Sequence, residues 1–431
     1  MMAETSAPQN KLQDLFERSG EVAVGTSEAR KKAYDYLQDN GLPGKRDEEY
    51  RYTPLTRIVE KQFDLATDLD SAFESDLDPS PFFVPEASGH RVVFINGIYS
   101  AKYSQVGNGL QVSTLNESED TELLEQYYGK HPFAAEDSWA ALNTSLSREG
   151  LVIKAGTDHK AGSPLYIYYL TDGRSQKTAS QIHHLILAER SANLQVVEVF
   201  GGTGDNASFV NTATEVIVRD NARVEHYKLG LDSEETIHAG HTMVHQGRDS
   251  HYHNVTINLT GGVVRNNMNV VQDAENCETH MIGLYLLHGK QHIDNHTVVD
   301  HRKPNSYSNE LYKGVMADKS MAVFNGKIFV RQEAQKTNAF QSNKNLLLSD
   351  NATVNTKPQL EIWADDVKCS HGATTGQVDK EQVFYLMSRG LSREHARAML
   401  LGAFASEVTE QITIEPLRNY VEGIVNDRLT V

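Results

Sequence analysis

The sequence predicts a mainly β protein whose core is a right-handed parallel β-helix, with helical domains at its N-terminal and C-terminal ends. Three observations predict this fold class. Short β-branched and aromatic runs fill the chain from about residue 90 to about 370, similar polar turns separate them, and helical periodicity is almost confined to the two ends. We therefore divide the chain into a helical region with an acidic linker (1–88), a β-helix (89–376) and a helical domain (377–431).

The N-terminal region has helical periodicity over residues 8–60. Ser27 is a candidate N-cap and Gly41 a candidate stop for the clearer of two helices. Residues 60–80 then carry seven acidic residues against one lysine, which is typical of a solvated linker. The apolar positions that share a helix face are Leu12, Leu15 and Phe16 in the first helix and Ala29, Ala33, Tyr34 and Leu37 in the second.

The middle of the chain has the pattern of stacked β-coils. Its apolar runs include HRVVFING, PLYIYYL, LQVVEVF and MAVFNGKIFV, and no strand–helix alternation indicates a βαβ unit. Turns with an Asp, Asn or Ser cluster recur at rough multiples of about 15 residues, as in a solenoid. A β-sandwich or jelly roll is the alternative, because short strands with turns every 8–12 residues or so also fit those folds. The turns lie at 188–195, 218–225, 272–279, 316–323, 348–355 and 363–370.

The C-terminal region returns to helical periodicity. Asp379 and Gln382 form a candidate capping box, and Gly390 is a candidate end for that helix. Ser392 opens a second helix, and a third follows Pro416. The predicted apolar stripes are Val383, Leu386 and Met387, then Ala396, Met399, Leu400, Ala403 and Phe404, then Leu417, Tyr420, Val421, Ile424 and Val425.

Composition and motifs exclude several classes of protein. The net charge of −17 argues against a nucleic-acid binder, and no apolar run is long enough to span a bilayer. The N-terminus lacks the apolar core of a secretory signal, and the only cysteines, Cys277 and Cys369, form no disulfide framework, so we expect a cytoplasmic protein. The sequence contains no P-loop, G-x-G-x-x-G, G-x-S-x-G or H-E-x-x-H motif. Any ATP-driven step therefore needs a partner that binds the nucleotide.

Eleven of the eighteen histidines fall between residues 226 and 301. His251 and His253 would share one face of a strand, since side chains alternate with period two. Imidazole is a common transition-metal ligand, so a metal site is one interpretation. We favour the other, a polar strand face whose histidines bond to neighbouring coils, because the spacings match no closed ligand set.

The stretch KCSHGATTG (368–376) places a cysteine two positions before a histidine. On a continuing strand, Cys369 and His371 project from the same face and Ser370 from the other. Thiolate and imidazole are good ligands for iron or zinc, and a nearby histidine can lower the pKa of a cysteine, but two ligands do not complete a four-coordinate site. The pair is therefore either structural or a functional site that a second chain completes at an interface.

Residues 341–408, which include IWADDVKCSHGATTGQVD, closely resemble the SufB/SufD family of the SUF iron–sulfur cluster assembly system. The similarity extends back through 309–341, weakly to GLPGKRDEEYRYTPL in the N-terminal region, and covers most of the chain. The resemblance implies N-terminal helices, a right-handed parallel β-helix, a C-terminal helical domain, and a scaffold that performs no catalysis itself.

Partners and site residues follow from the resemblance. It implies pairing with SufB through the β-helices and docking of the SufC ATPase on the helices after Asp379. The family's functional histidine, which would contact the metal of a transient iron–sulfur cluster at the SufB interface, falls on His371, and the neighbouring cysteine falls on Cys369. No cofactor is expected to bind tightly to the isolated chain, which we expect to be a homodimer because solenoid edges pair.

Other functions remain as alternatives. The glycine after His371 and the scarcity of cysteine favour the SufD branch of the family over the paralogous SufB. A β-helix polysaccharide lyase or hydrolase would need paired carboxylates in a groove, whereas Asp365 and Asp366 are adjacent and would point to opposite faces of a strand. A homodimeric metal-storage or sensor protein that uses the histidines is the third alternative.

Overall fold

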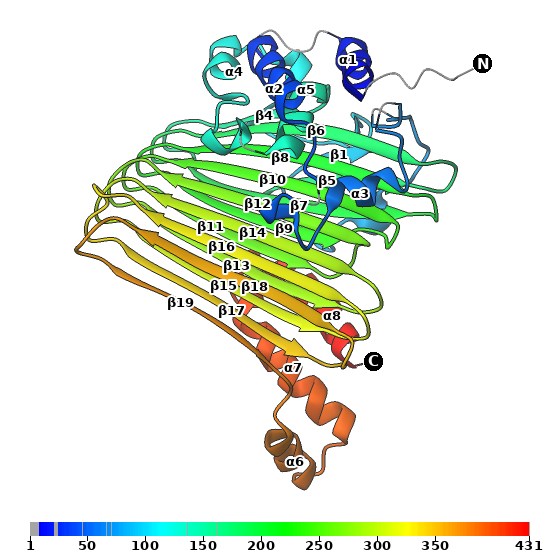
Figure 1. Cartoon of the computed structure of the whole chain (residues 1–431), viewed down its shortest axis with the longest axis vertical. Coiled ribbons are helices and arrows are strands. Elements are labelled where there is room, and N and C mark those ends of the chain that lie inside the picture. The colour runs from blue at the N-terminus through cyan, green and yellow to red at the C-terminus, as the bar shows by residue number, and fades with distance from the viewer. Residues whose placement is uncertain are drawn as a thin grey trace.

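The computed structural model describes residues 8–20, 25–44, 46–65, 67–69, 71–135, 137–160 and 162–430. It is mainly β, a parallel β-solenoid with helices at both ends of the chain (Figure 1). The predicted parallel β-helix is confirmed, and the β-sandwich alternative is wrong. The side chain of Leu12, part of the first predicted stripe, lies outside the described residues.

Two sheets run the length of the solenoid, and successive strands of the chain alternate between them. We call them the odd sheet and the even sheet. The odd sheet contains β1 (His90–Ile95), β2 (Ile98–Tyr99), β5 (Leu165–Asp172), β7 (Asn193–Thr203), β9 (Arg223–Leu231), β11 (His251–Asn258), β13 (Glu278–Leu287), β15 (Tyr307–Met316), β17 (Asn338–Leu347) and β19 (Lys368–Gly376). The even sheet contains β3 (Gln111–Thr114), β4 (Leu151–Ala155), β6 (Thr178–Ala188), β8 (Ser208–Val218), β10 (Thr236–Gln246), β12 (Val263–Gln272), β14 (His292–His301), β16 (Met321–Val330) and β18 (Thr353–Ile362).

Each coil of the solenoid contributes one strand to each sheet. Ile237 pairs with Val263 and Val152 pairs with Leu185, so from β4 onward one coil takes between 26 and 33 residues. This agrees with the predicted unit of about 15 residues, because each unit is one strand and its turn. Four of the six predicted turns contain a residue with φ near +60°, which Asn and Asp tolerate better than most residues. These residues are Ser191, Asn221, Asn276 and Asp318.

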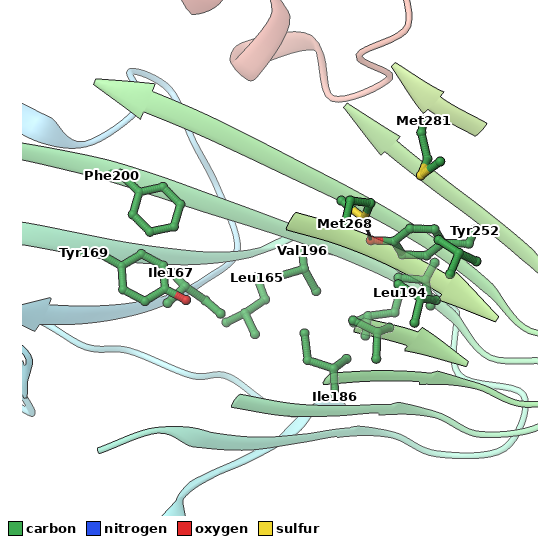
Figure 2. Close-up of a cluster of buried hydrophobic side chains, with 14 of the residues drawn as sticks. Leu165, Ile167, Tyr169, Ile186, Leu194, Val196, Phe200, Tyr252, Met268 and Met281 are labelled. Carbon is green, nitrogen blue, oxygen red and sulfur yellow. Dashed lines mark hydrogen bonds between the residues drawn. The ribbon is translucent and has the colours of Figure 1, made fainter. Parts of the chain in front are cut away.

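The inward side chains of the two sheets form the central core (Figure 2). Tyr169 and Phe200, on neighbouring coils, stack with ring centroids 4.5 Å apart. Farther along, Tyr252 lies beside Met268, and its hydroxyl approaches the sulfur at 3.9 Å. Because strand side chains alternate, the pattern of this core also fixes which residues point outward.

The N-terminal helices cover the outer face of the even sheet. Leu37 and Trp139 pack there with the outward-facing Phe209. The helices are α1 (Pro8–Ser19), α2 (Ser27–Asn40), α3 (Leu55–Glu60), α4 (Thr121–Tyr127) and α5 (Ser138–Leu146), with short 3₁₀ segments η1 (Glu48–Tyr50), η2 (Ser80–Phe82), η3 (Leu115–Glu117) and η4 (Pro132–Ala135).

Three details of the N-terminal half correct the sequence predictions. First, α4 and α5 interrupt a region that we expected to be almost free of helix. Every residue of α5 is buried, so it shows no amphipathic stripe. Second, Thr26 rather than Ser27 stands at the N-cap of α2, whereas Gly41 ends that helix as predicted, with a φ of +66°.

The third correction concerns the acidic segment at 60–80, which is not a freely solvated linker. Leu77 is buried against the outer face of the odd sheet. Ser75 donates a 2.6 Å hydrogen bond to Asp172, and Arg174 donates one of the same length to Asp76. The segment is therefore fixed to the first coils.

The C-terminal helices α6 (Lys380–Ser388), α7 (Arg393–Thr409) and α8 (Glu415–Thr430) follow the last coil. Buried residues of α7 and α8 pack on the outer face of the odd sheet, and α6 projects beyond β19 (Figure 1). Asp379 accepts from the backbone N–H of Gln382, and Ser392 from that of His395, as the caps predicted. The predicted α7 stripe is partly wrong: Met399 is 54% exposed, because Leu401, Ala405 and Val408 face the sheet instead. Among the described residues no helix is long and apolar enough to cross a membrane.

Candidate functional site at the open end of the solenoid

The last coil leaves the solenoid open. β19 pairs only with β17, and β18 pairs only with β16, so each sheet ends in a strand with one free edge. Free edges present unpaired N–H and C=O groups to another chain. The side chains of β18 and β19 are half-buried or exposed along their whole length, in contrast to the buried strands beneath them.

The register of β19 fixes where Cys369 and His371 point. Cys369 pairs with Ala339 and His371 with Gln341, both of which are buried and face the interior. In-register residues of a parallel sheet share a face, so Cys369 and His371 both project toward the open interior and Ser370 projects outward. The two residues lie on one face, as the sequence predicted.

Cys369 is partly buried in an apolar environment. It packs with Ala339, Ile328 and Val330 in a small cluster at this end of the core. Burial raises the pKa of the Cys369 thiol, and a backbone hydrogen bond involving Ala339 only partly opposes the shift. The neighbouring histidine therefore does not generate a thiolate here, and the cysteine is protonated at neutral pH.

His371 is exposed. Its imidazole has no hydrogen bond or ion pair within the part of the chain that the structure describes. An imidazole of this kind can accept a metal or a proton from another molecule.

The described residues of this chain bring together no complete set of metal ligands. Among the described residues, no three His, Cys, Asp or Glu side chains converge on a common point. Cys277 lies before β13, three strands from β19 in the same sheet, and burial raises the pKa of its thiol to about 11. The site therefore offers one free imidazole and one half-buried thiol.

A polar network lies directly below His371. Gln341 occupies the same interior column one coil down, and Glu310 occupies it two coils down. Gln341 Nε2 donates a 3.0 Å hydrogen bond to Glu310 Oε2, and Thr297 Oγ1 donates to the same oxygen at 2.7 Å. Sequence reasoning missed this pair. Aligning the successive coils, in which positions 310, 341 and 371 coincide, would have found it.

The histidines of the region 226–301 are distributed over three faces. His226 faces the interior, and His292 lies beneath the N-terminal segment, 2.8 Å from Thr53 Oγ1. His251 and His253 share the outer face of the odd sheet, as predicted, and His251 lies 2.9 Å from Glu278 of the next coil. His226, His251 and His292 thus contact neighbouring coils or segments, as the polar-face interpretation expects.

Sequence reasoning also missed how the segment 46–54 binds the even sheet. Glu49 accepts hydrogen bonds from Lys327 at 2.6 Å and from Asn325 at 3.1 Å, and lies 3.4 Å from His296. Hydrogen bonding to His296 and Lys327 outweighs burial and lowers the pKa of Glu49 to about 2. These contacts join the N-terminal region to the coils next to the open end.

An apolar patch lies beside the open end on α6 and α7. Phe384 is 73% exposed and Tyr385 57%, and Met387 and Met399 are also exposed. Exposed aromatic and methionine side chains grouped on helices are typical of protein interfaces.

Comparisons with known proteins agree with this architecture. Residues 169–404 match the family described as "SUF system FeS cluster assembly, SufBD core domain", and residues 8–167 match the SufBD N-terminal region. The chain is 33% identical to a SufBD-family iron–sulfur cluster assembly protein of Synechocystis, over 97% of this chain and 95% of that protein. It is 32% identical to the iron–sulfur cluster assembly protein SufD of Escherichia coli, over 99% of both chains. The SufD of Bacillus subtilis is 28% identical over 72% of this chain and 71% of that protein.

Proposed function

Because this chain belongs to the SufBD family of iron–sulfur cluster assembly proteins and is close to SufD, we propose that it is a non-catalytic scaffold subunit of a cytoplasmic SUF complex. It pairs with SufB, recruits the SufC ATPase, and helps to build and transfer nascent iron–sulfur clusters. The single observation that carries this proposal is the open end of the solenoid, where an unpartnered imidazole stands on a strand with a free edge.

Pairing through the open end explains both the free edges and the incomplete site. A second β-helix that aligns with β18 and β19 would satisfy their unpaired backbone groups. The same contact would bring ligands from the partner to His371 and Cys369. In the absence of SufB, a second copy of this chain uses these edges, which gives a homodimer.

The nascent cluster is the cargo of this site. His371 supplies a neutral imidazole nitrogen to the iron, and SufB supplies the thiolate ligands that this chain lacks. Cys369, with its raised thiol pKa, becomes a ligand only if metal or sulfide at the interface removes its proton.

The exposed patch on α6 and α7 is the proposed docking surface for SufC. This assignment fits the absence of a nucleotide-binding motif from the sequence, since SufC would supply ATP hydrolysis. Lys313 of β15 donates a 2.5 Å hydrogen bond to Glu407 of α7 and lies over the Phe404 ring at 4.1 Å. These contacts fix α7 to the odd sheet.

Co-expression with SufB and SufC tests the assembly. We expect a stable complex that contains all three chains. The double variant Phe384→Ser with Tyr385→Ser should lose SufC and retain SufB, whereas Val106→Ser, which changes an exposed apolar residue beside the first strand of the solenoid, should retain both. A native chain that bound neither partner would overturn the proposal.

Substitution of the imidazole tests the site. His371→Ala should leave the complex intact but abolish cluster formation, measured by the visible absorption of the anaerobically purified complex and by complementation in cells. His288→Ala is the matched control, because His288 is also exposed but lies in a turn away from the open end. Equal cluster content in His371→Ala and in the native complex would remove His371 from the site.

A further inference from the structure

The column beneath His371 contains two buried oxygen atoms that nothing satisfies. Glu310 and Gln341 are both buried, and neither Glu310 Oε1 nor Gln341 Oε1 has a hydrogen-bond partner among the described residues. An unsatisfied buried polar atom costs free energy, so its presence calls for a physical explanation. Both atoms belong to the pair that occupies the same interior column as His371.

The even sheet leaves room for the amide of Gln341 at one point. A Cβ atom on Gly326 of β16 would lie 2.2 Å from Gln341 Nε2 and 2.7 Å from its Cδ, so the amide reaches across the interior to a position that only glycine leaves open. Gln341 is thus the side chain that bridges the two sheets one coil below His371.

Among the described residues, no cation lies beside Glu310 to stabilise its ionised form. Its hydrogen-bond donors are the neutral Thr297 and Gln341, and burial raises its pKa to about 7. The other titratable side chains that face inward from the strands packed around it are Tyr285, Tyr312 and His301. Burial raises the pKa of both tyrosines far above neutrality and lowers that of His301 to about 3, so all three stay neutral. Glu310 is therefore the group in this part of the interior whose charge changes near neutral pH.

The ionised and protonated forms of Glu310 hydrogen-bond to opposite ends of the Gln341 amide. An ionised carboxylate only accepts, and it accepts from Gln341 Nε2 as observed. A protonated carboxyl can donate its O–H, and the Gln341 carbonyl oxygen becomes its acceptor if the amide turns by about 180°. The proton comes from solvent and stays on Glu310, and no covalent bond other than that O–H changes.

We propose that Gln341 is a positioning residue for His371, and that gain or loss of a proton by Glu310 reverses which end of the Gln341 amide faces the open end of the solenoid. With Glu310 ionised, the carbonyl oxygen of Gln341, which has no partner among the described residues, is open to an N–H of the His371 imidazole in the same column. With Glu310 protonated, the NH₂ group of Gln341 faces His371 and donates a hydrogen bond to one ring nitrogen, which is then not free to bind metal. The first state leaves the other ring nitrogen free to bind metal. This last step rests on the proposed cluster site at His371, whereas the amide reversal does not.

The amide of Gln341 reports on this mechanism directly. The full-length chain is labelled with ¹⁵N in its glutamine side chains, and the Gln341 signal is assigned as the one missing from Gln341→Leu. We expect this signal to move between pH 5.5 and 8.5, with a midpoint at about 7, and to stay fixed in Glu310→Gln. The change of an exposed carboxylate, Glu333→Gln, should leave the movement as in the native chain. A Gln341 signal that ignores pH, or one that moves equally in Glu310→Gln, would overturn the inference.

A second pair of variants separates positioning from simple stability. Gly326→Ala should displace the amide and alter the ring signals of His371, while Gly376→Ala, where an added Cβ meets nothing within 4 Å, should not. Unchanged His371 signals in a folded Gly326→Ala chain would also overturn the inference. Both measurements need neither partner nor cluster, so a failure to assemble with SufB counts against the proposed function alone.

Discussion

The solenoid contains two interior polar networks, one closed and one open, and they differ in how completely they are satisfied. The closed network surrounds Glu198, which accepts hydrogen bonds from Tyr169 at 2.7 Å and Thr214 at 3.0 Å and contacts His226 at 2.9 Å. Lys228 lies 3.8 Å away. The open network surrounds Glu310, which has two neutral donors and an unpartnered oxygen.

The difference appears in the charge of the two carboxyls. Burial alone would raise the pKa of Glu198, but Lys228 and His226 outweigh it and hold that pKa far below its usual range. Among the described residues no cation lies beside Glu310, so burial dominates and its pKa rises. The same residue type, equally buried, is thus a fixed anion in the middle of the solenoid and a titrating acid near the open end. Both carboxylate oxygens of Glu198 have hydrogen-bond partners, whereas one oxygen of Glu310 has none among the described residues.

Removal of the anion from the closed network should have the largest effect. Glu198→Ala leaves Lys228 and His226 buried without their partner, and we expect a loss of about 3–5 kcal/mol in the free energy of unfolding, measured with urea at pH 7. If Glu198→Ala unfolded at the same urea concentration as the native chain, the closed network would not be structural.

In the open network, the protonated form of Glu310 should stabilise the fold, whereas in the closed network the ionised form of Glu198 does. The folded pKa of Glu310 is about 7 against 4.5 for the free group, so its proton stabilises the fold below pH 4.5, and that contribution is lost as pH rises through 7. Relative to Glu310→Gln, the native chain should therefore lose roughly 3 kcal/mol between pH 4.5 and 8. Parallel stability curves for the two proteins across this range would contradict the assignment.

Acidification should lower the free energy of unfolding through His184, which lies near Glu198 of the closed network. This buried imidazole accepts a 2.8 Å hydrogen bond from the Leu151 N–H, and burial lowers its pKa to about 3 from 6.5. Its contribution is present above pH 6.5 and is lost as pH falls toward 3. Between pH 7 and 5 we expect a loss of about 2 kcal/mol that is absent from His184→Asn. If the native chain and His184→Asn lost the same amount, the acid sensitivity would belong to other groups.

The smallest effect on stability should come from the site itself. His371 is exposed and has no partner in the described structure, so His371→Ala should change the free energy of unfolding by less than about 0.5 kcal/mol. The same measurement on Cys369→Ala should give a larger loss, because Cys369 packs in the apolar cluster at the end of the core. A destabilised His371→Ala chain would mean that the imidazole has a structural role.

Much of the fold was predictable because it depends on local patterns. The Asp and Asn turns mark the corners of the coils, and Asp379 and Ser392 cap the helices that follow the last strand. Apolar runs such as those of β5, β7 and β16 were recognised as strands. The polar strands β12, β14 and β17 were not, because asparagine, histidine and lysine occupy positions where an apolar alternation is the usual signal.

The sequence by itself determined the solenoid, its repeat, its C-terminal helix caps and the shared face of Cys369 and His371, since each depends on neighbours a few residues apart. Only the tertiary structure decided which polar side chains meet inside. Glu310, Gln341 and His371 lie about one coil apart in sequence yet form one column, and Gly326 joins that column from the opposite sheet. Contacts of this kind depend on the exact length of every coil between them, because one added residue reverses the face of each side chain that follows.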